Sequence, residues 1–314
     1  MKRFILKLLL FLSIPLCFLY VLSYIVDTGL KKSKYFYYSE WNDLFNGRVN
    51  ADLLVLGNSR AWVHFSPQIL DSMLNLNSYN LGLDGACLNA QLVRFKLYLL
   101  YNNKPKYIIQ EIGATGSLIN GTLPHLQQLY PYLDNSEIWK IVKSSDPSFG
   151  VLERYFPLYK YNNELTLIKE GILSYFGKGV KPTKYKGYEG RKILWDNGFE
   201  SFVKLYPKGT ISKIDSSQFS VLMDYIDFCK KNDIKIIFVT SPTYKEYIPY
   251  VLNYTQVIDT ITNIANANNI PYLDYTKDTL CNSKEYFYNT NHLNYIGSRL
   301  FSIKFANDIK KYIN

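Results

Sequence analysis

A serine near the start of the chain lies in a context that suits a nucleophile. Ser59 belongs to the run Gly57-Asn58-Ser59-Arg60, which directly follows the apolar segment Asp52–Leu56. A strand that ends at a glycine presents the next hydroxyl and the neighbouring N–H groups at the open edge of a sheet. Acyl transfer needs this arrangement, because the N–H groups can stabilise the oxyanion that develops on the substrate. Turns of this kind also bind phosphate or only reverse the chain, so the motif alone leaves these alternatives open.

A histidine near the end of the chain can act as the base for this serine. His292 lies in the polar run Tyr288–Asn294, immediately before the last predicted helix. Asn289, three residues earlier, has a side-chain oxygen that can orient one imidazole nitrogen while the other nitrogen faces Ser59. A lone histidine is often structural, but the polar surroundings of this one argue against a place in the core. We therefore expect Ser59, His292 and Asn289 to form the catalytic group.

Together the two runs resemble sequence blocks of the SGNH/GDSL hydrolase family, in particular its membrane-anchored members in bacterial surface-polysaccharide loci. In that family an early strand ends in Gly-x-Ser, and a late Asp-x-x-His block precedes the last helix. The corresponding residues here are Gly57-Asn58-Ser59-Arg60 and Asn289-Thr290-Asn291-His292, and the second run continues as Leu293-Asn294-Tyr295-Ile296-Gly297. The resemblance covers roughly Asp52–Gly113 and the chain from Ser216 to the C-terminus.

The resemblance also implies an oxyanion hole and substrate contacts. The family's second block supplies a glycine after the second strand, and Gly85 in the run Asn80–Gly85 occupies that place. The hole would then consist of the N–H groups of Ser59 and Gly85. Asn58 and Arg60 flank the nucleophile and are expected to bind the substrate, although Arg60 could instead anchor the turn through an ion pair. The hypothesis requires neither a metal nor a cofactor.

Two departures from the family pattern bear on activity. The third block, Gly-x-Asn-Asp, is absent after the third predicted strand, where Gln110 and Thr115 are the candidate side-chain donors to the oxyanion. Asn289 stands where the family has aspartate, and an amide oxygen can orient the imidazole but cannot supply a negative charge. Asp274 or Glu285 could supply that charge from another direction. A degenerate, inactive site is the alternative that these departures leave open.

Strand-like and helix-like segments alternate through the rest of the chain. The predicted strands are Asp52–Leu56, Ser78–Leu81, Tyr107–Ile109, Ile234–Val239 and Pro271–Leu273, and the predicted helices are one that opens at Ser66-Pro67, Leu88–Tyr101, Ser216–Lys231, Val257–Ala267 and about Tyr295–Tyr312. This alternation predicts an α/β fold with a three-layer, mostly parallel sheet flanked by helices, of SGNH-like or flavodoxin-like type. Ligands of such sheets gather at the carboxyl ends of the strands, where Ser59 is expected to lie.

The N-terminus predicts a membrane anchor. Residues 8–26 carry no charge and follow Lys2, Arg3 and Lys7. At about 1.5 Å per residue they nearly match a hydrocarbon core of roughly 30 Å, and the run is too long for a signal-peptide core. We interpret residues 1–50 as an uncleaved signal-anchor with a tether, and residues 51–314 as the α/β domain with an insertion or cap at about 114–215. A single pass with the domain outside the cytoplasm is expected, since short basic N-termini stay inside.

Composition and charge limit the classes of partner. The chain has 314 residues, a formal net charge of +10 and a sequence pI of about 9.1. This charge favours anionic partners such as lipid head groups or acidic cell-surface polymers, but no helix-turn-helix, zinc-finger or RNA-recognition pattern indicates nucleic acid. Four scattered cysteines and three histidines indicate neither a disulfide framework nor a metal site. Nothing in the sequence indicates an oligomeric state.

The chemistry and the anchor together favour one function and leave one alternative. We expect a serine esterase or O-acyltransferase that acts on an acylated carbohydrate, or on another ester, at the cell envelope. Ser59 would attack the ester carbonyl while His292 takes its proton. The alternative is a catalytically inactive relative that serves as a binding or assembly subunit of a polysaccharide modification or export system. A nucleotide-binding role for the Ser59 turn is disfavoured, because the glycine patterns of phosphate-binding loops are absent.

Overall fold

A computed structural model describes residues 2–36 and 38–313 of the chain. Internal contacts divide the chain into two compact units. The first, here called the helical unit, combines the N-terminal segment up to Asp43 with His125–Thr183, and the second, here called the α/β unit, comprises Leu44–Pro124 and the chain from Lys184 onward. The segment predicted as an insertion, about 114–215, is therefore divided, with its middle part in the same unit as the N-terminal segment.

The α/β unit is built on a parallel sheet. Its strands are β1 (Leu53–Leu56), β2 (Ser78–Asn80), β3 (Tyr107–Glu111), β4 (Lys235–Thr240) and β5 (Tyr272–Asp274), in the order β2-β1-β3-β4-β5. Every neighbouring pair in this sheet is parallel. The same strand order is found in flavodoxin-like folds. The predicted fold class, a mostly parallel sheet flanked by helices with an apolar helix at the N-terminus, is confirmed.

The sequence of β1 explains why the sheet is central. Its residues, Leu-Leu-Val-Leu, are all buried, and a strand with apolar side chains on both faces needs a covering layer on each side. Val55 pairs with Asn80 of β2 on one side and with Ile109 of β3 on the other. This parallel register brings the carboxyl ends of β1, β3 and β4 to one edge of the sheet, so the residues that follow these strands lie close together.

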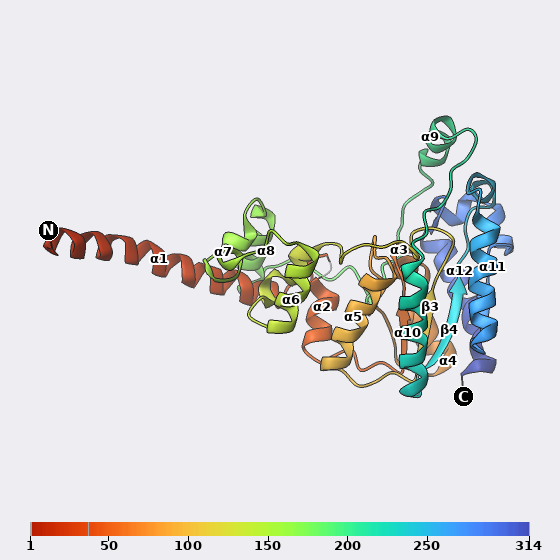
Figure 1. The fold of residues 1–314 in the computed structure, drawn as a ribbon, viewed down its shortest axis with the longest axis horizontal. Helices are drawn as coiled ribbons and strands as arrows, with labels where there is room; N and C mark the ends of the chain where they lie inside the picture. The colour runs from red at the N-terminus through yellow and green to blue at the C-terminus, as the bar shows by residue number, and fades with distance from the viewer. Residues whose placement is uncertain (1, 37, 314) are drawn as a thin grey trace. The chain divides into compact units, whose positions relative to one another are not determined.

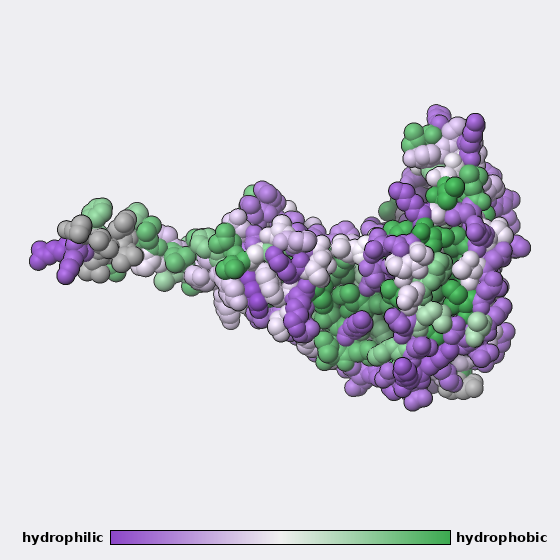
Figure 2. All heavy atoms as spheres, in the orientation of Figure 1, coloured by the Kyte–Doolittle hydropathy of each residue, from purple (hydrophilic) through white to green (hydrophobic). Residues whose placement is uncertain are grey.

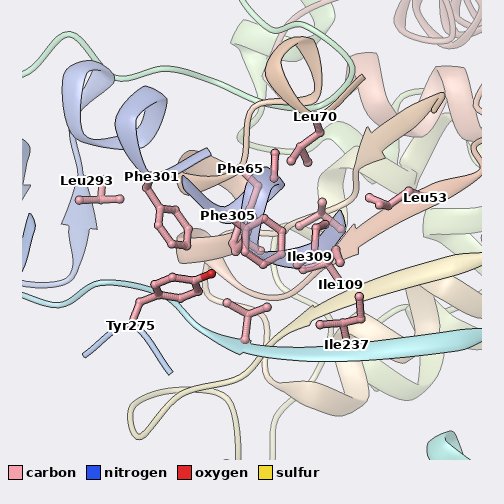
Figure 3. Close-up of a cluster of buried hydrophobic side chains, with 14 of the residues drawn as sticks. Leu53, Phe65, Leu70, Ile109, Ile237, Tyr275, Leu293, Phe301, Phe305 and Ile309 are labelled. Atoms are coloured by element: carbon pink, nitrogen blue, oxygen red, sulfur yellow. The ribbon is translucent and has the colours of Figure 1, made fainter. Parts of the chain in front are cut away.

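Helices cover both faces of the sheet (Figure 1). One face carries α3 (Ser59–His64), α4 (Pro67–Leu74) and α12 (Tyr295–Ile309), and the other carries α5 (Leu88–Tyr101) and α10 (Ser217–Lys231), which pack on each other. Between the first group of helices and the sheet, the rings of Phe65, Phe301 and Phe305 pack with strand residues such as Ile109 (Figure 3). This apolar layer fixes α12 against β1, and therefore fixes the turn that precedes α12 near the turn that follows β1.

The remaining elements of the α/β unit lie mostly in its C-terminal half. They are α9 (Gly198–Leu205), α11 (Tyr254–Ala267), the short helices η3 (Lys245–Tyr250), η4 (Thr279–Asn282), η5 (Lys284–Tyr286) and η6 (Lys310–Tyr312), and an antiparallel hairpin of β6 (Phe287–Asn289) and β7 (His292–Leu293). The polar run around His292 is therefore a hairpin. Its strands are too short to show a period-2 pattern, which explains why the sequence did not indicate them.

The helical unit contains the N-terminal helix and the middle of the predicted insertion. It consists of α1 (Lys2–Leu30), most of α2 (Tyr38–Phe45), η1 (Leu126–Tyr132), α6 (Ser136–Ser145), α7 (Val151–Tyr155), η2 (Tyr159–Tyr161) and α8 (Leu165–Tyr175). Helices α1 and α8 pack closely, because Gly29 and Gly171 leave no side chain between their backbones. Val26, Leu30 and Tyr38 are fully or almost fully buried in the small core of this unit.

Among the described helices, α1 holds the segment that is long and apolar enough to cross a membrane. This segment is Leu10–Leu30, with a mean hydropathy of 2.0. The predicted anchor, residues 8–26, lies inside α1. The residues predicted as a tether differ from expectation, since the helix continues to Leu30 and residues 38–45 form α2. The physical reason is burial, because Leu30 and Tyr38 belong to the core of the helical unit rather than to an exposed linker.

Candidate active site

The turn after β1 is shaped by its glycine. Gly57 has a φ of +152°, and a Cβ here would lie 2.6 Å from Cβ of Ala61 and 2.8 Å from Cβ of Glu111. No other residue fits this close approach, so the chain passes directly from β1 into α3. Asn58 caps α3, because its Oδ1 accepts the N–H of Arg60 at 2.9 Å. Ser59 is consequently held at the first position of the helix.

His292 faces Ser59 at this edge of the sheet. Nε2 of His292 lies 2.7 Å from Oγ of Ser59, although the two residues are 233 positions apart in the sequence. The hairpin that carries His292 is held in place by a fully buried side chain, since the N–H of Leu293 donates to Nε2 of His64 at 2.9 Å. The structure thus brings together the serine and the histidine singled out from the sequence, at hydrogen-bonding distance.

The residues after His292 join the hairpin to α12. Asn294 caps this helix, because its Oδ1 accepts the N–H groups of Ile296 and Gly297, each at 3.0 Å. Gly297 lies against the carbonyl oxygen of Tyr286, where a Cβ would collide. The run His292-Leu293-Asn294-Tyr295-Ile296-Gly297 therefore has a structural purpose: the asparagine starts the helix, and the glycine lets the helix approach the segment before the hairpin.

Asn289 determines which nitrogen of His292 carries the proton. Its Oδ1 accepts the N–H groups of Asn291 and His292, each at 3.1 Å, and lies 2.8 Å from Nδ1 of His292. An atom that accepts backbone N–H groups must be the amide oxygen, so Nδ1 is the protonated nitrogen and Nε2 has its lone pair toward Ser59. Among the described residues, neither Asp274 nor Glu285 hydrogen-bonds the His292 ring.

The surroundings of His292 keep its ring uncharged. Tyr288 stacks on the imidazole, with the ring planes 5° apart and the centroids separated by 5.2 Å. Burial, together with the positive charges of Arg60 and Arg191, lowers the pKa of His292 to about 4. At neutral pH the ring can therefore accept a proton from Ser59, but the imidazolium that results is disfavoured by its neighbours.

A buried polar network connects the serine turn with the histidine hairpin. Nδ1 of His64 lies 2.8 Å from Oγ of Ser241, and this hydroxyl donates to Oε1 of Glu111 at 3.1 Å. Arg60 completes the network, since its Nε lies 3.1 Å from the same carboxylate oxygen. All four side chains are nearly inaccessible to solvent. Because His64 also binds Leu293, the network links α3, β3, β4 and the hairpin.

The sequence alone did not identify this network. His64 is the last residue of α3 and is fully buried, and no motif in its neighbourhood indicates this role. Glu111 ends β3 and Ser241 directly follows β4. A signal was available, because polar residues at the carboxyl ends of neighbouring parallel strands are expected to meet at one edge.

Arg60 makes the ion pair that was one of its two expected roles. Its guanidinium contacts Glu111 and also donates from Nη2 to the carbonyl oxygen of Ser241. Among the described residues, Nη1 has no hydrogen-bond partner, and Arg60 also lines the cavity at Ser59. The structure therefore gives Arg60 an anchoring contact, while its Nη1 is buried and unpaired among the described residues.

A cavity of about 260 Å³ opens at Ser59 and His292. Its lining includes every residue proposed for the site except Asn289, namely Asn58, Ser59, Arg60, Gly85 and His292, together with Thr115, Gly116, Ile119 and Asn291. Gly85 has a φ of +69°. Among the described residues, neither its N–H group nor that of Ser59 donates a hydrogen bond. Both N–H groups are thus available to an oxyanion.

The two candidates for a third oxyanion donor lie in different places. Nε2 of Gln110 donates to Oε1 of Gln91 at 2.8 Å, so this side chain is committed to another buried amide. Thr115 lines the cavity. A larger cavity of about 310 Å³, lined by Ile226, Lys230 and Pro271 among others, contains neither serine nor histidine. Within the described part of the chain, no group of three or more His, Cys, Asp or Glu side chains is arranged to hold a metal ion.

Comparisons with known proteins found likeness only among solved structures. No family model matches the chain. No curated protein matches it in sequence. A proposed acylhydrolase from Bacteroides fragilis NCTC 9343 is 13% identical, with 83% of this chain and 88% of that chain covered and a TM-score of 0.42.

Two further solved structures show a similar degree of likeness. A proposed lipolytic protein of the G-D-S-L family from Desulfitobacterium hafniense DCB-2 is 11% identical, with 81% and 97% of the two chains covered and a TM-score of 0.39. A GDSL-like lipase from Bacteroides thetaiotaomicron VPI-5482 is 13% identical, with 83% and 88% covered and a TM-score of 0.40. The α/β unit, with its parallel sheet, Ser59 directly after its first strand and His292 before its last helix, is consistent with an SGNH-like α/β fold.

Proposed function

We propose that the α/β unit is a serine ester hydrolase or O-acyltransferase. The observation that carries the proposal is the 2.7 Å approach of Nε2 of His292 to Oγ of Ser59, with Nδ1 of the same ring held by Asn289 at 2.8 Å. A nucleophile, a base and a residue that orients the base are the minimum for acyl transfer through a serine. The cavity beside them supplies two N–H groups, of Ser59 and Gly85, for the oxyanion.

The reaction proceeds in two halves. Oγ of Ser59 attacks the ester carbonyl carbon while its proton moves to Nε2 of His292, and the carbonyl electrons collect on the oxygen as an oxyanion. When this tetrahedral intermediate collapses, the imidazolium returns the proton to the leaving alkoxide, and the acyl group remains on Ser59. In the second half, water or a sugar hydroxyl gives its proton to Nε2 and attacks the acyl-serine. When this second intermediate collapses, the bond between the acyl carbon and Oγ of Ser59 breaks, and the imidazolium returns the proton to Oγ. Water thus completes a hydrolysis, and a sugar hydroxyl completes a transfer.

Asn289 stands where a Ser-His-Asp triad has its aspartate, and this makes His292 a weak catalytic base. An amide oxygen holds the ring and its tautomer, but it does not compensate the positive charge that His292 acquires. In the serine proteases that serve as the standard example, a comparable Asp to Asn change lowers turnover by roughly 10⁴-fold, largely through the wrong tautomer. Here the tautomer is correct, because Asn289 presents its oxygen to Nδ1. We therefore expect a slow but competent enzyme.

The proposed substrate is an acylated carbohydrate of the cell envelope. The support is the anchor-like helix α1, the formal charge of +10, and a cavity lined by polar groups beside Ile119. In this proposal, α1 crosses the membrane once, with Lys2 and Arg3 on the cytoplasmic side and the α/β unit outside the cytoplasm. A basic protein held at a membrane surface is suited to anionic polymers.

Labelling with a fluorophosphonate probe tests the proposed chemistry directly. The full chain in detergent micelles should be labelled in proportion to time, while Ser59→Ala and His292→Ala should not. Ser201, an exposed serine on α9, provides the matched control, and Ser201→Ala should be labelled like the unmodified protein. Incubation with an acetylated oligosaccharide then separates the two reactions, since hydrolysis releases acetate and transfer acetylates an added sugar acceptor.

The second candidate is a binding or assembly subunit without catalysis. Asn289 in place of an aspartate is the observation that favours it, together with the commitment of Gln110 to Gln91 rather than to the cavity. Absence of Ser59-dependent labelling, in protein whose circular dichroism shows it to be folded, would replace the enzymatic proposal with this one.

A further inference from the structure

An exposed apolar patch lies on the helical unit. It is formed by α7 and the residues that follow it, namely Val151, Leu152, Tyr155, Phe156 and Tyr159, and is here called the α7 patch. Val151 is 73% exposed, Leu152 is 53% exposed and Tyr155 is 60% exposed. Contiguous apolar side chains exposed to this extent mark a binding surface more often than a water-facing one.

The α7 patch is continuous with the exposed face of α1. The hydroxyl of Tyr20 donates to the carbonyl oxygen of Tyr155 at 3.2 Å, and the N–H of Leu158 donates to Oγ of Ser23 at 3.4 Å. Figure 1 shows α7 directly against α1 within this unit. On the α1 side, Tyr20 and Tyr24 are themselves exposed. Two segments distant in sequence therefore form one apolar surface at the level of residues 20–24.

The same level is where α1 enters the folded part of the helical unit. Beyond it, Val26 and Leu30 are completely buried, and Asp27 is bound by Lys160 at 2.8 Å and by Tyr161 at 2.6 Å. Residues with these protein partners are not in contact with lipid. The lipid-facing part of α1 therefore ends near Tyr24, earlier than hydropathy alone indicates.

The length of α1 before this level fits a bilayer. Phe4, Phe11, Ile14 and Phe18 are all exposed, and green, hydrophobic atoms follow the purple N-terminal tip of α1 in Figure 2. At 1.5 Å per residue, residues 4–23 extend about 30 Å, the thickness of a hydrocarbon core. Lys7 falls near the far end of this span, where its long side chain can reach the head groups. One membrane boundary is then at Tyr20–Tyr24, beside the α7 patch.

We propose that the α7 patch inserts into the head-group region of the membrane that α1 crosses. The patch contacts the lipid surface itself, so the helical unit lies on the bilayer and is not connected to it only by a flexible tether. Tyr20, Tyr24, Tyr155 and Tyr159 form the aromatic belt expected at such a boundary, while Val151 and Leu152 enter the outer hydrocarbon. The inference rests on the proposed membrane anchoring of α1 and is independent of the ester chemistry.

Nitroxide labels on single cysteines test this placement in the full chain. Cys17 is the one exposed cysteine of the described residues, so Cys17→Ala removes it and leaves the buried Cys87, Cys229 and Cys281. In this background the patch is probed by Leu152→Cys. Phe176→Cys is the matched control, because Phe176 is also apolar and exposed but adjoins Tyr175, which lies beside Gly29, about 14 Å along α1 from Tyr20. Ile14→Cys serves as the membrane reference.

The readout is the accessibility of each label to oxygen and to a water-soluble nickel chelate, measured in liposomes of phosphatidylcholine and phosphatidylglycerol. We expect labels at positions 152 and 14 to be reached by oxygen and protected from nickel, and the label at position 176 to show the reverse. Nickel access at position 152 equal to that at 176, with position 14 still protected, overturns the proposal. Nickel access at position 14 instead rejects the anchor itself. Low access of both reagents at position 152 indicates a protein partner, such as a second copy, and also overturns the proposal.

Discussion

Oδ1 of Asn289 lies 2.8 Å from Nδ1 of His292, in the position that a carboxylate oxygen occupies in a Ser-His-Asp triad. The same oxygen accepts the N–H groups of Asn291 and His292, so the tight turn between β6 and β7 and the orientation of the base depend on one side chain. Asparagine performs both tasks without adding a charge. The pKa of His292 is lowered by burial and by the positive charges of Arg60 and Arg191, and the neutral amide of Asn289 adds no negative charge beside the ring.

Replacing this asparagine tests whether the missing charge limits the rate. Asn289→Asp keeps the hydrogen bonds and adds a carboxylate that stabilises the imidazolium, so labelling by a fluorophosphonate at pH 7 should accelerate by roughly tenfold or more. Asn289→Ala removes both orientation and turn geometry and should slow labelling. The second-order rate constant is the measurement. An unchanged or lower rate in a folded Asn289→Asp protein would show that the charge of His292 does not control the reaction.

The pH dependence of labelling reports the protonation of His292. Only the neutral ring can take a proton from Ser59, and burial with two neighbouring arginines lowers its pKa to about 4. The labelling rate should therefore be nearly constant from pH 7 to pH 5 and fall as the pH drops through about 4. In Asn289→Asp the carboxylate favours the charged ring, so the midpoint should move upward. A midpoint near 6.5 in the unmodified protein, the ordinary value for histidine, contradicts the buried, arginine-flanked environment.

The sequence predicts the members of the proposed catalytic pair but not the residues that hold them. Ser59 and His292 are recognisable because each lies in a short sequence motif. Ser59 follows a glycine turn after a strand, and His292 ends an Asn-x-x-His run. The strands were recognisable because buried parallel strands are continuous apolar runs, as in β1 and β4.

The supporting network has no such local signature. His64 contacts Ser241, which is 177 positions away, and Leu293, which is 229 positions away. These contacts arise only when the sheet order and the packing of α12 are known. The helical unit was missed for a similar reason, because the segment after Asp27 and the segment from His125 to Thr183 each lack a core and acquire one only by packing together.

Substitution of His64 should affect both stability and the rate of labelling. Burial and the nearby Arg60 and His292 lower the pKa of His64 well below its usual value, and its Nε2 already accepts the N–H of Leu293. The native state therefore keeps His64 neutral, while the unfolded state binds a proton below about pH 6.5. This contribution to stability is complete above about pH 6.5 and is lost as the pH falls, by up to about 1.4 kcal/mol per pH unit for one proton.

His64→Gln tests this, because glutamine cannot bind the proton that His64 takes up in the unfolded state. The urea midpoint should change less between pH 7 and pH 5 than in the unmodified protein, and labelling should slow because Leu293 and the hairpin lose their anchor. A matched change at Ser217, which is exposed at the start of α10, should alter neither quantity. An unchanged pH dependence in His64→Gln means that this side chain is not kept neutral by folding.

Two glycines near Ser59 should respond differently to replacement by alanine. At Gly57 an added Cβ meets Ala61 and Glu111 within 3 Å, so Gly57→Ala must displace the turn that carries Ser59. At Gly85 an added Cβ meets none of the described atoms within 4 Å, and the strain comes only from its φ of +69°, which costs about 1–2 kcal/mol. We expect Gly57→Ala to lose labelling and fold poorly, and Gly85→Ala to remain folded with its N–H group in place. Equal urea midpoints for the two variants would contradict this distinction.

Substitutions in the ion pair of Arg60 and Glu111 distinguish an anchoring role of Arg60 from a substrate-binding role. Both side chains are almost fully buried and 3.1 Å apart, so removing one leaves the other as an unpaired buried charge. Such changes typically destabilise a protein by about 3–5 kcal/mol, whereas replacing both partners by apolar residues is often nearly neutral. Glu111→Leu and Arg60→Met should each lower the urea midpoint strongly, and the double variant should recover much of the loss.

The double variant then isolates the effect of Arg60 on the chemistry. Without its positive charge, the pKa of His292 should rise from about 4, and the labelling midpoint should move to higher pH. If Arg60 also binds an anionic group of the substrate through the unpaired Nη1, hydrolysis of a charged ester should weaken through a higher KM, while hydrolysis of a neutral ester should not. If Arg60 only anchors the turn, the midpoint should still shift, and the KM values for the charged and the neutral ester should change equally. An unchanged midpoint in the folded double variant would remove Arg60 from the electrostatics of the site.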